Sequence, residues 1–292
     1  MVATSSWKAL SWSSSHIASG YSSARSSWVR LARPLGVRGL PIAGRLATPA
    51  LEVGAATVVP VTLTVVRPDQ GEFSWSVTVG PDQPRDNSTA NQIKAVLGRA
   101  EPGQRVQLWI ERAGADDDAF AFDLGFVSYR DLWRMQLTLP ADRSSIATRG
   151  FIPGADNDDF LRVNNRAFHW HPEQGGMTPR DLADRMAENW FDAEGFRLYE
   201  QSGCLAGFCW TKVHPDETPP GGEIYAIAVD PDFHGQGLGK PMTLAGLDYL
   251  ADQGLTVGFL YVESDNDPAV ATYRSLGFDH HSTNRAYRLT IE

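Results

Sequence analysis

The sequence predicts an α/β protein with a mixed sheet, made of two copies of one folding unit. Short sequence segments recur in the same order, about 150 residues apart. Within the second copy, stretches with the period of strands alternate with stretches that have the helical period. At 292 residues, the chain has the length of two domains or one large one.

The repeat consists of pairs of similar short segments. They occur in the same order in both halves, and the two members of each pair are separated by a nearly constant number of residues. The pairs are TVVRPD at 64–69 with TKVHPD at 211–216, Gly71-Glu72 with Gly222-Glu223, VTVGPD at 77–82 with IAVDPD at 227–232, LGF at 124–126 with LGF at 276–278, and LTL at 137–139 with LTI at 289–291. We therefore predict a degenerate first half at 52–140 and a complete second half at 141–292. Residues 1–51 contain no Asp or Glu and are rich in Ser; this is typical of a divergent or disordered leader, although an organelle transit peptide has a similar composition.

The composition argues against several functional classes. A formal net charge of −9 is unsuited to a broad nucleic-acid surface, which needs Lys and Arg. The nearest approach to a membrane span, 53–66, is too short and contains a proline, so we interpret it as a strand. Cys204 and Cys209 are too few for a disulfide scaffold and lack the second pair that a zinc site needs. We interpret them as packing thiols and expect a cytoplasmic protein without a metal.

The second copy is predicted as a β-α-α-β-β-β-α-β-α-β-β unit. Thr178 followed by Pro179 is a typical helix start. The expected strands are 145–151, 196–201, 204–213, 223–229, 255–263 and two short ones around Phe278 and at 287–291, and the expected helices are 158–168, 179–190, 238–252 and 268–276.

Three alternating glycines, Gly235, Gly237 and Gly239, come directly before the helix at 238–252. Alternate glycines allow a ligand to approach the backbone, and a helix N-terminus attracts anions. His234 and Pro241 exclude a Walker A loop, and the third glycine comes one residue too early for a Rossmann fingerprint. The loop therefore predicts a pyrophosphate site. Its spacing resembles the acetyl-CoA loop of the GCN5-related N-acetyltransferases (GNAT), with His234 in place of the usual Arg or Gln, and this resemblance implies a tandem GNAT fold.

A second motif, residues 266–278, resembles the N-x-x-A-x-x-x-Y-x-x-x-G-F segment of the same family. The resemblance implies that Tyr273 protonates the departing CoA thiolate and that acetyl-CoA is the co-substrate. The residues implied in its binding are Ile227, Ala228, Val229, His234, Gly235, Gln236, Gly237, Leu238, Gly239, Lys240, Asn266, Asp267, Pro268, Ala269, Val270 and Ala271. In the first copy, Arg85, Asn87 and Thr89 align with the three glycines and Ala121 with Tyr273, so we expect no competent CoA site there.

Several longer segments resemble the mycothiol synthases, a family of two-domain acetyltransferases. Among them are residues 162–178, 208–216, 222–231 and 260–266. That resemblance implies an enzyme that acetylates the cysteine amine of Cys-GlcN-Ins, with Glu173, Lys212, Glu223 and Tyr261 on the acceptor. We expect the protein to be a monomer. An amine must arrive neutral to attack, and Glu223, on the strand before the CoA loop, is the candidate base, directly or through water. Two alternatives stay open: another amine acceptor, or a non-catalytic acyl-CoA-binding sensor or scaffold.

Overall fold

One nine-stranded mixed sheet runs through the whole molecule, in the order β1-β2-β3-β9-β4-β8-β7-β6-β5. The computed structural model describes residues 63–66, 72–169 and 176–292, so the predicted leader at 1–51 lies outside it. The strands are β1 (Thr64–Val66), β2 (Trp75–Val79), β3 (Arg105–Ile110), β4 (Val127–Thr138), β5 (Phe196–Gln201), β6 (Cys204–His214), β7 (Gly221–Val229), β8 (Val257–Glu263) and β9 (Asp279–Thr290). The helices are α2 (Asn87–Leu97), α3 (Ala115–Asp123), α4 (Asn157–Ala167), α5 (Pro179–Met186), α6 (Gly239–Asp252) and α7 (Asp267–Ser275), with a 3-10 turn at Pro231–Phe233.

The structure confirms the predicted tandem fold. The bounds of α3 and α7 differ by 152 residues at both ends, as do those of β4 and β9, and this is the offset of the repeated LGF words. The predicted sequence boundaries, 52–140 and 141–292, stay a prediction, because the two halves share one sheet.

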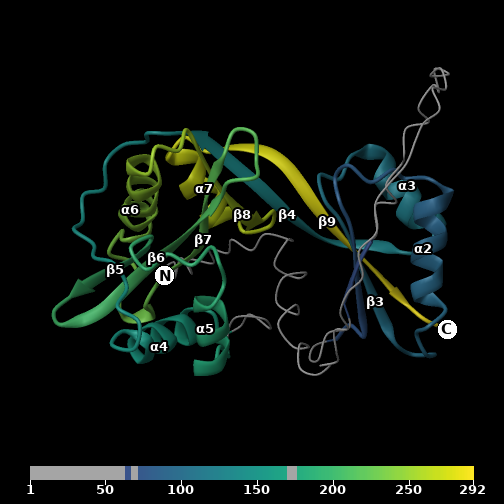
Figure 1. Ribbon diagram of the computed structural model, residues 1–292, viewed down its shortest axis with the longest axis horizontal. Coiled ribbons are helices and arrows are strands. Elements are labelled where there is room, and N and C mark those ends of the chain that lie inside the picture. Colours follow the sequence, from purple (N-terminus) through teal and green to yellow (C-terminus); the bar gives the residue numbers. More distant parts are fainter. Residues whose placement is uncertain (1–62, 67–71, 170–175) are drawn as a thin grey trace, which may run out of the picture.

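Each half supplies a strand to the other half's part of that sheet. β4 lies between β8 and β9, while β9 lies between β3 and β4, and the two long strands cross from one half to the other (Figure 1). The registers are equivalent: Arg105 pairs with Thr290 in one half, and Val257 pairs with Thr138 in the other. Each of these positions is 152 residues from its counterpart, so the halves are related by a pseudo-twofold axis. The second half is thus completed by a strand of the first.

Most predicted elements are confirmed with small shifts of their ends, and three predictions are wrong. The segment 145–151 is no strand, because it meets β5 only at the isolated bridge Arg149–Leu198. The two predicted C-terminal strands are one, β9, which stays continuous because it pairs with β3 and β4 on its two edges. The helix expected at 179–190 ends at Met186, although it begins as predicted, with Thr178 as the capping residue. Of the strand expected at 53–66, residues 53–62 lie outside the described residues.

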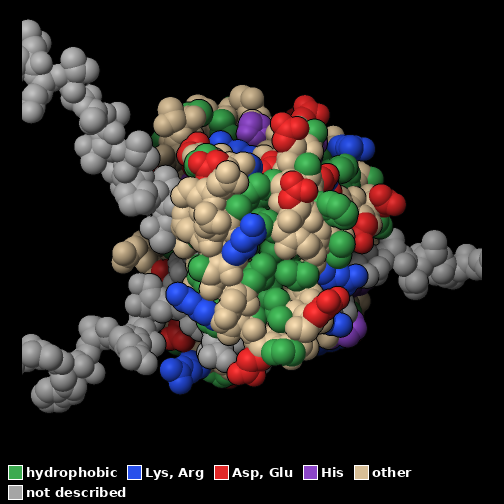
Figure 2. All heavy atoms as spheres, turned by 90° about the vertical axis from the view of Figure 1, so that its right-hand side faces the viewer, with side chains coloured by type: hydrophobic (Ala, Val, Ile, Leu, Met, Phe, Trp, Pro, Cys, Tyr) green, Lys and Arg blue, Asp and Glu red, His purple; other side chains and the backbone are tan. Residues whose placement is uncertain are grey.

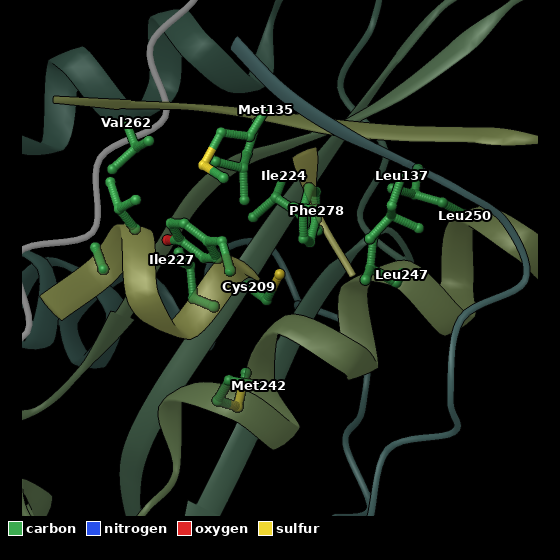
Figure 3. Packing of buried hydrophobic residues seen from close by; sticks show 14 of the residues in the cluster. Met135, Leu137, Cys209, Ile224, Ile227, Met242, Leu247, Leu250, Val262 and Phe278 are labelled. Carbon is green, nitrogen blue, oxygen red and sulfur yellow. The ribbon is translucent and has the colours of Figure 1, made fainter. Parts of the chain in front are cut away.

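The two faces of the sheet in the second half carry different side chains. Under α6 and α7 lies an apolar core that includes Ile224, Leu260 and Met135 (Figure 3). Cys209 belongs to this core, where burial raises the pKa of its thiol to about 12, but Cys204 is exposed and packs in no core. The opposite face packs against α4 and α5 through an aromatic cluster, and it carries the polar residues described below.

The outer side of the first half is covered by α2 and α3 (Figure 1). Acidic, basic and apolar side chains are interspersed there (Figure 2). None of the helices in the described ranges is both long and apolar enough to cross a membrane.

Candidate active site

Strands β7 and β8 separate in the middle of the sheet, and this opening defines the site. Their parallel pairing stops at Ile224–Leu260, although β7 continues to Val229 and stays paired with β6 apart from one register shift near Trp210. The Asp230 N–H bonds to the Ala206 carbonyl of β6 at 2.8 Å. Because N–H directions alternate along a strand, the amides at 227 and 229 point away from β6, toward the opening. An extended ligand can therefore pair with this edge as an added strand.

The glycine loop follows directly and is open on its outer side. Gly235 and Gly237 have φ values of +79° and +75°, and a Cβ at either position would meet no atom within 4 Å. Helix α6 begins at Gly239, and its N-cap residue, Leu238, has no polar side chain to cap it. Its N-terminal amides are therefore available to an anion, which fits the pyrophosphate of a CoA ligand.

Two residues, His234 and Asp230, fix the position of the glycine loop. The His234 ring contacts the Val229 carbonyl at 2.9 Å, so Nε2 carries the proton and donates. This bond fixes the orientation of the ring. Asp230, fully buried, forms ion pairs with Arg162 and Arg166 of α4 at 3.1 and 3.2 Å, and they fix the start of the loop against that helix.

The second predicted motif forms α7, on the core side of the opening. Asn266 caps the helix by accepting a hydrogen bond from the Ala269 N–H at 3.3 Å. The Tyr273 ring is buried against Phe278, with 5.7 Å between ring centroids. Burial raises the pKa of Tyr273 above its usual value. The tyrosine borders a pocket together with residues 227–229 of β7, Gly239 and Thr243 of α6, and Ala167, Phe168 and Thr272.

The other predicted cofactor residues of this region fall into two groups. Ala269 and Val270 are buried in the core, whereas Asp267, Pro268 and Ala271 are exposed, as are Gln236 and Lys240 of the loop. Exposed positions around the opening can contact a ligand with their side chains, while the buried ones shape the site from behind.

The first copy closes the equivalent site with its own side chains. The Asp86 carboxylate caps α2 by accepting hydrogen bonds from the N–H groups of Ser88 and Thr89, at 2.9 and 3.0 Å. It occupies the amides that would otherwise attract an anion. α2 therefore lacks the uncapped N-terminus that α6 presents.

Arg85 fills the space between the strands of the first copy. Its guanidinium bonds the carbonyls of Gly80 and Glu111, at the ends of β2 and β3, at 2.9 and 3.4 Å, and the Asp117 carboxylate at 2.6 Å. These positions correspond to the ends of β7 and β8 and the start of α7. An internal ion pair thus stands where the second copy is open.

The helix starts correct the predicted alignment of the glycines by two residues. α2 begins at Asn87 and α6 at Gly239, so Arg85 corresponds to Gly237 and Asn87 to Gly239. The connection 230–238 is two residues longer than 80–86, a difference that a comparison at a fixed offset cannot detect. Neither first-copy position is a glycine, so the expected loss of the loop is unchanged.

Glu223 lies on the face of the sheet away from α7. It is fully buried, and its Oε2 lies 2.7 Å from His214 Nε2. Its Oε1 has no hydrogen-bond partner among the described residues. One carboxylate oxygen is therefore held by the protein while the other can accept a proton from a ligand.

Two further predicted acceptor residues lie beside Glu223. Lys212 is its cross-strand neighbour on β6, with Nζ 4.9 Å from the centre of the Trp190 ring, and burial lowers the pKa of this lysine. Tyr261, on β8, is buried, and burial raises the pKa of its hydroxyl. The fourth, Glu173, lies outside the described residues.

Sequence reasoning missed His214. The signal was available, because 214 and 223 lie on the two arms of a β-hairpin, but which residues face each other depends on its register, and a bulge shifts that register near Trp210. In the described part of the chain, no group of three His, Cys, Asp or Glu side chains is placed to bind a metal.

The chain is similar to proteins of known family over most of its length. A model of the acetyltransferase (GNAT) family matches residues 162–278. Relatives named mycothiol acetyltransferase include one from Actinosynnema mirum, 41% identical over 237 residues that cover 78% of each chain. Another, from Mycobacteroides abscessus, is 47% identical over 218 residues, 72% of this chain and 73% of that relative.

Two solved structures share the fold. A GCN5-related N-acetyltransferase from Sphaerobacter thermophilus is 19% identical, with a TM-score of 0.59 over 78% of this chain and 75% of that one. A tandem GNAT protein from the clavulanic acid biosynthesis pathway is 17% identical, with a TM-score of 0.53 over 78% of each chain. With its tandem architecture, its open CoA-type loop and these relatives, the chain is an N-acetyltransferase that belongs to the mycothiol acetyltransferase family.

Proposed function

We propose that the protein acetylates the cysteine amine of Cys-GlcN-Ins, with acetyl-CoA as the donor, by direct attack in a ternary complex. The observation that carries this proposal is a pair of ionisable side chains on opposite faces of the sheet, near the point where β7 and β8 separate. Glu223 approaches from one face of the sheet with a free carboxylate oxygen, and Tyr273 from the other. An amine and a thioester that meet at this opening would each have a proton partner.

Acetyl-CoA supplies an activated acetyl group when bound. The amides at 227 and 229 would pair with its extended arm, and the loop at 234–240 would hold its pyrophosphate. The amide at 229 is also placed to polarise a carbonyl oxygen lying in the opening. On α7, residues 266–271 would border the same arm.

The proton steps belong to side chains of the second half. Glu223 takes a proton from the attacking amine, directly or through one water, while His214 keeps the carboxylate oriented. Tyr273 gives a proton to the departing thiolate, and its raised pKa keeps the hydroxyl protonated until then. Lys212, Tyr261 and Glu173 contact the acceptor. No covalent enzyme intermediate is needed.

Mass spectrometry of reactions with acetyl-CoA and a panel of amines tests the acceptor. We expect acetylation of Cys-GlcN-Ins in preference to aminoglycosides and peptide N-termini. Preference for another amine would replace the acceptor, and no product with any amine would favour an acyl-CoA sensor. Initial rates with both substrates varied should give intersecting lines, whereas parallel lines would contradict a ternary complex.

We also propose that the protein is a cytoplasmic monomer. The unpaired thiols of Cys204 and Cys209 support a reducing compartment. Light scattering coupled to gel filtration should give a mass near 32.0 kDa, and twice that mass would contradict the proposal.

A further inference from the structure

A row of functional side chains crosses four neighbouring strands on the face that carries Glu223. Lys212 of β6 pairs with Glu223 of β7, and Glu223 pairs with Phe259 of β8. Tyr261, two residues on along β8, pairs with Arg134 of β4. Paired residues, and residues two apart on a strand, point to the same face. The row therefore ends on a residue of the first half.

Arg134 is buried in an unusual setting for a cation. Its side chain is 7% exposed, and its guanidinium forms a two-point pair with Glu217, at 3.1 and 2.6 Å. The guanidinium carbon lies 3.9 Å from the centre of the Phe259 ring. These contacts fix the plane of the group. Its Nε has no partner within residues 63–66, 72–169 and 176–292, and an unpaired buried donor is costly to a folded protein.

Two buried polar atoms without a protein partner thus face the same side of the sheet. Glu223 Oε1 can only accept a hydrogen bond when ionised, and Arg134 Nε can only donate one. They stand two strands and about two residues apart, so strand geometry puts their Cα atoms about 12 Å from each other. A ligand that satisfies both has an amine at one end and oxygen acceptors about one sugar ring away.

We propose that Arg134 is a specificity-determining residue, which binds the hydroxyl-bearing end of the acceptor through Nε. The inference rests on the proposed function, since Cys-GlcN-Ins carries its hydroxyl groups on the side away from the cysteine amine. Glu217 and Phe259 hold the guanidinium in place, and Nε–H donates to a hydroxyl oxygen. The degenerate first half thereby supplies part of the acceptor site through the exchanged strand β4.

The test compares two acceptors that share the amine and differ in the polyol. In the Arg134→Gln variant, we expect kcat/KM for Cys-GlcN-Ins to fall about 10–100-fold, the loss of one charge-assisted hydrogen bond. This decrease in kcat/KM should result from a higher KM. For cysteinamide, which has no sugar or inositol, kcat/KM should match that of the wild type, and so should the KM for acetyl-CoA.

Arg130→Gln is the matched control. Arg130 also lies on β4 and reaches the second half, through an ion pair with Glu263, so its loss costs a similar cross-half contact, and we expect no discrimination between the two acceptors. Should Arg134→Gln fail to fold, Arg134→Lys keeps a cation near Glu217 but lacks the Nε donor, and we expect the same selective loss.

Equal losses for both acceptors, or no loss for either, would overturn the role of Arg134 while leaving the proposed function in place. A wild-type enzyme that gives no product from Cys-GlcN-Ins would overturn both. The two failures are therefore distinguishable in one set of rates.

Discussion

Replacing Gly237 by valine separates what the glycine loop does for the fold from what it does for the ligand. The residue has a φ of +75° and free space around its Cβ position. A Cβ there would meet no protein atom within 4 Å, but the left-handed conformation costs about 1–2 kcal/mol. A branched side chain would also stand where the pyrophosphate meets the backbone. Losing one or two charge-assisted bonds should weaken acetyl-CoA binding about 10–100-fold.

The Gly103→Val variant provides the control. Gly103 has a φ of +83° and similar free space, but lies in a turn of the first half. Its substitution should lower the free energy of unfolding by a similar amount without changing the Kd for acetyl-CoA. The measurements are calorimetric titration with acetyl-CoA and urea denaturation of both variants. An unchanged Kd in Gly237→Val, or equal weakening in Gly103→Val, would refute the role of the loop.

Four further perturbations test the rest of the site and the packing. Glu223→Gln should lower kcat/KM about 10²–10⁴-fold, most strongly at low pH, where neutral amine is scarce; a wild-type pH–rate profile would remove Glu223 as the base. Tyr273→Phe should lower the rate equally from acid to mildly alkaline pH, because burial raises the pKa of this tyrosine and keeps it protonated throughout; acetyl-CoA affinity, measured by calorimetry, should stay the same. Arg85→Ala should reduce the free energy of unfolding by about 2 kcal/mol and leave one acetyl-CoA bound per chain, whereas a stoichiometry of two would show that the first site had only been blocked. Gly246→Ala should destabilise the fold by about 1–3 kcal/mol in urea denaturation, since its Cβ would lie 2.7 Å from Ile224 Cδ1; unchanged stability would contradict the described core packing.

The elements predicted from local signals match the structure best. Thr178 and Pro179 start a helix because capping and a fixed φ act within one turn, and β5 has the predicted bounds because its side chains alternate between faces. The polar start of β9, DHHSTN, gives no such pattern. Its first three side chains are exposed, and its strand conformation comes from pairing with β4, about 150 residues earlier in the chain.

The candidate site divides in the same way. Gly235, Gly237 and Tyr273 stand in contiguous motifs whose spacing is itself the signal. His214 and Arg134 carry no motif. The contact of His214 with Glu223 follows from the register of the β6–β7 hairpin, and the contact of Arg134 with Glu217 joins β4 to the connection between β6 and β7. In the first copy, the sequence showed only that the glycines of the loop are missing. It did not show that the ion pair of Arg85 with Asp117 fills the space where the second copy is open.

By itself, the sequence determined the repeat, most of its helices and strands, the CoA-type loop and the family resemblance, because each of these depends on residues close together along the chain. Only the tertiary structure decided that β4 and β9 are exchanged between the halves. A strand's hydrophobic pattern tells which face it buries but not which strand it pairs with, and pairing over long separations is settled by the packing of the whole sheet. That exchange is what brings Arg134, a residue of the first half, to the face of the second half that carries Glu223.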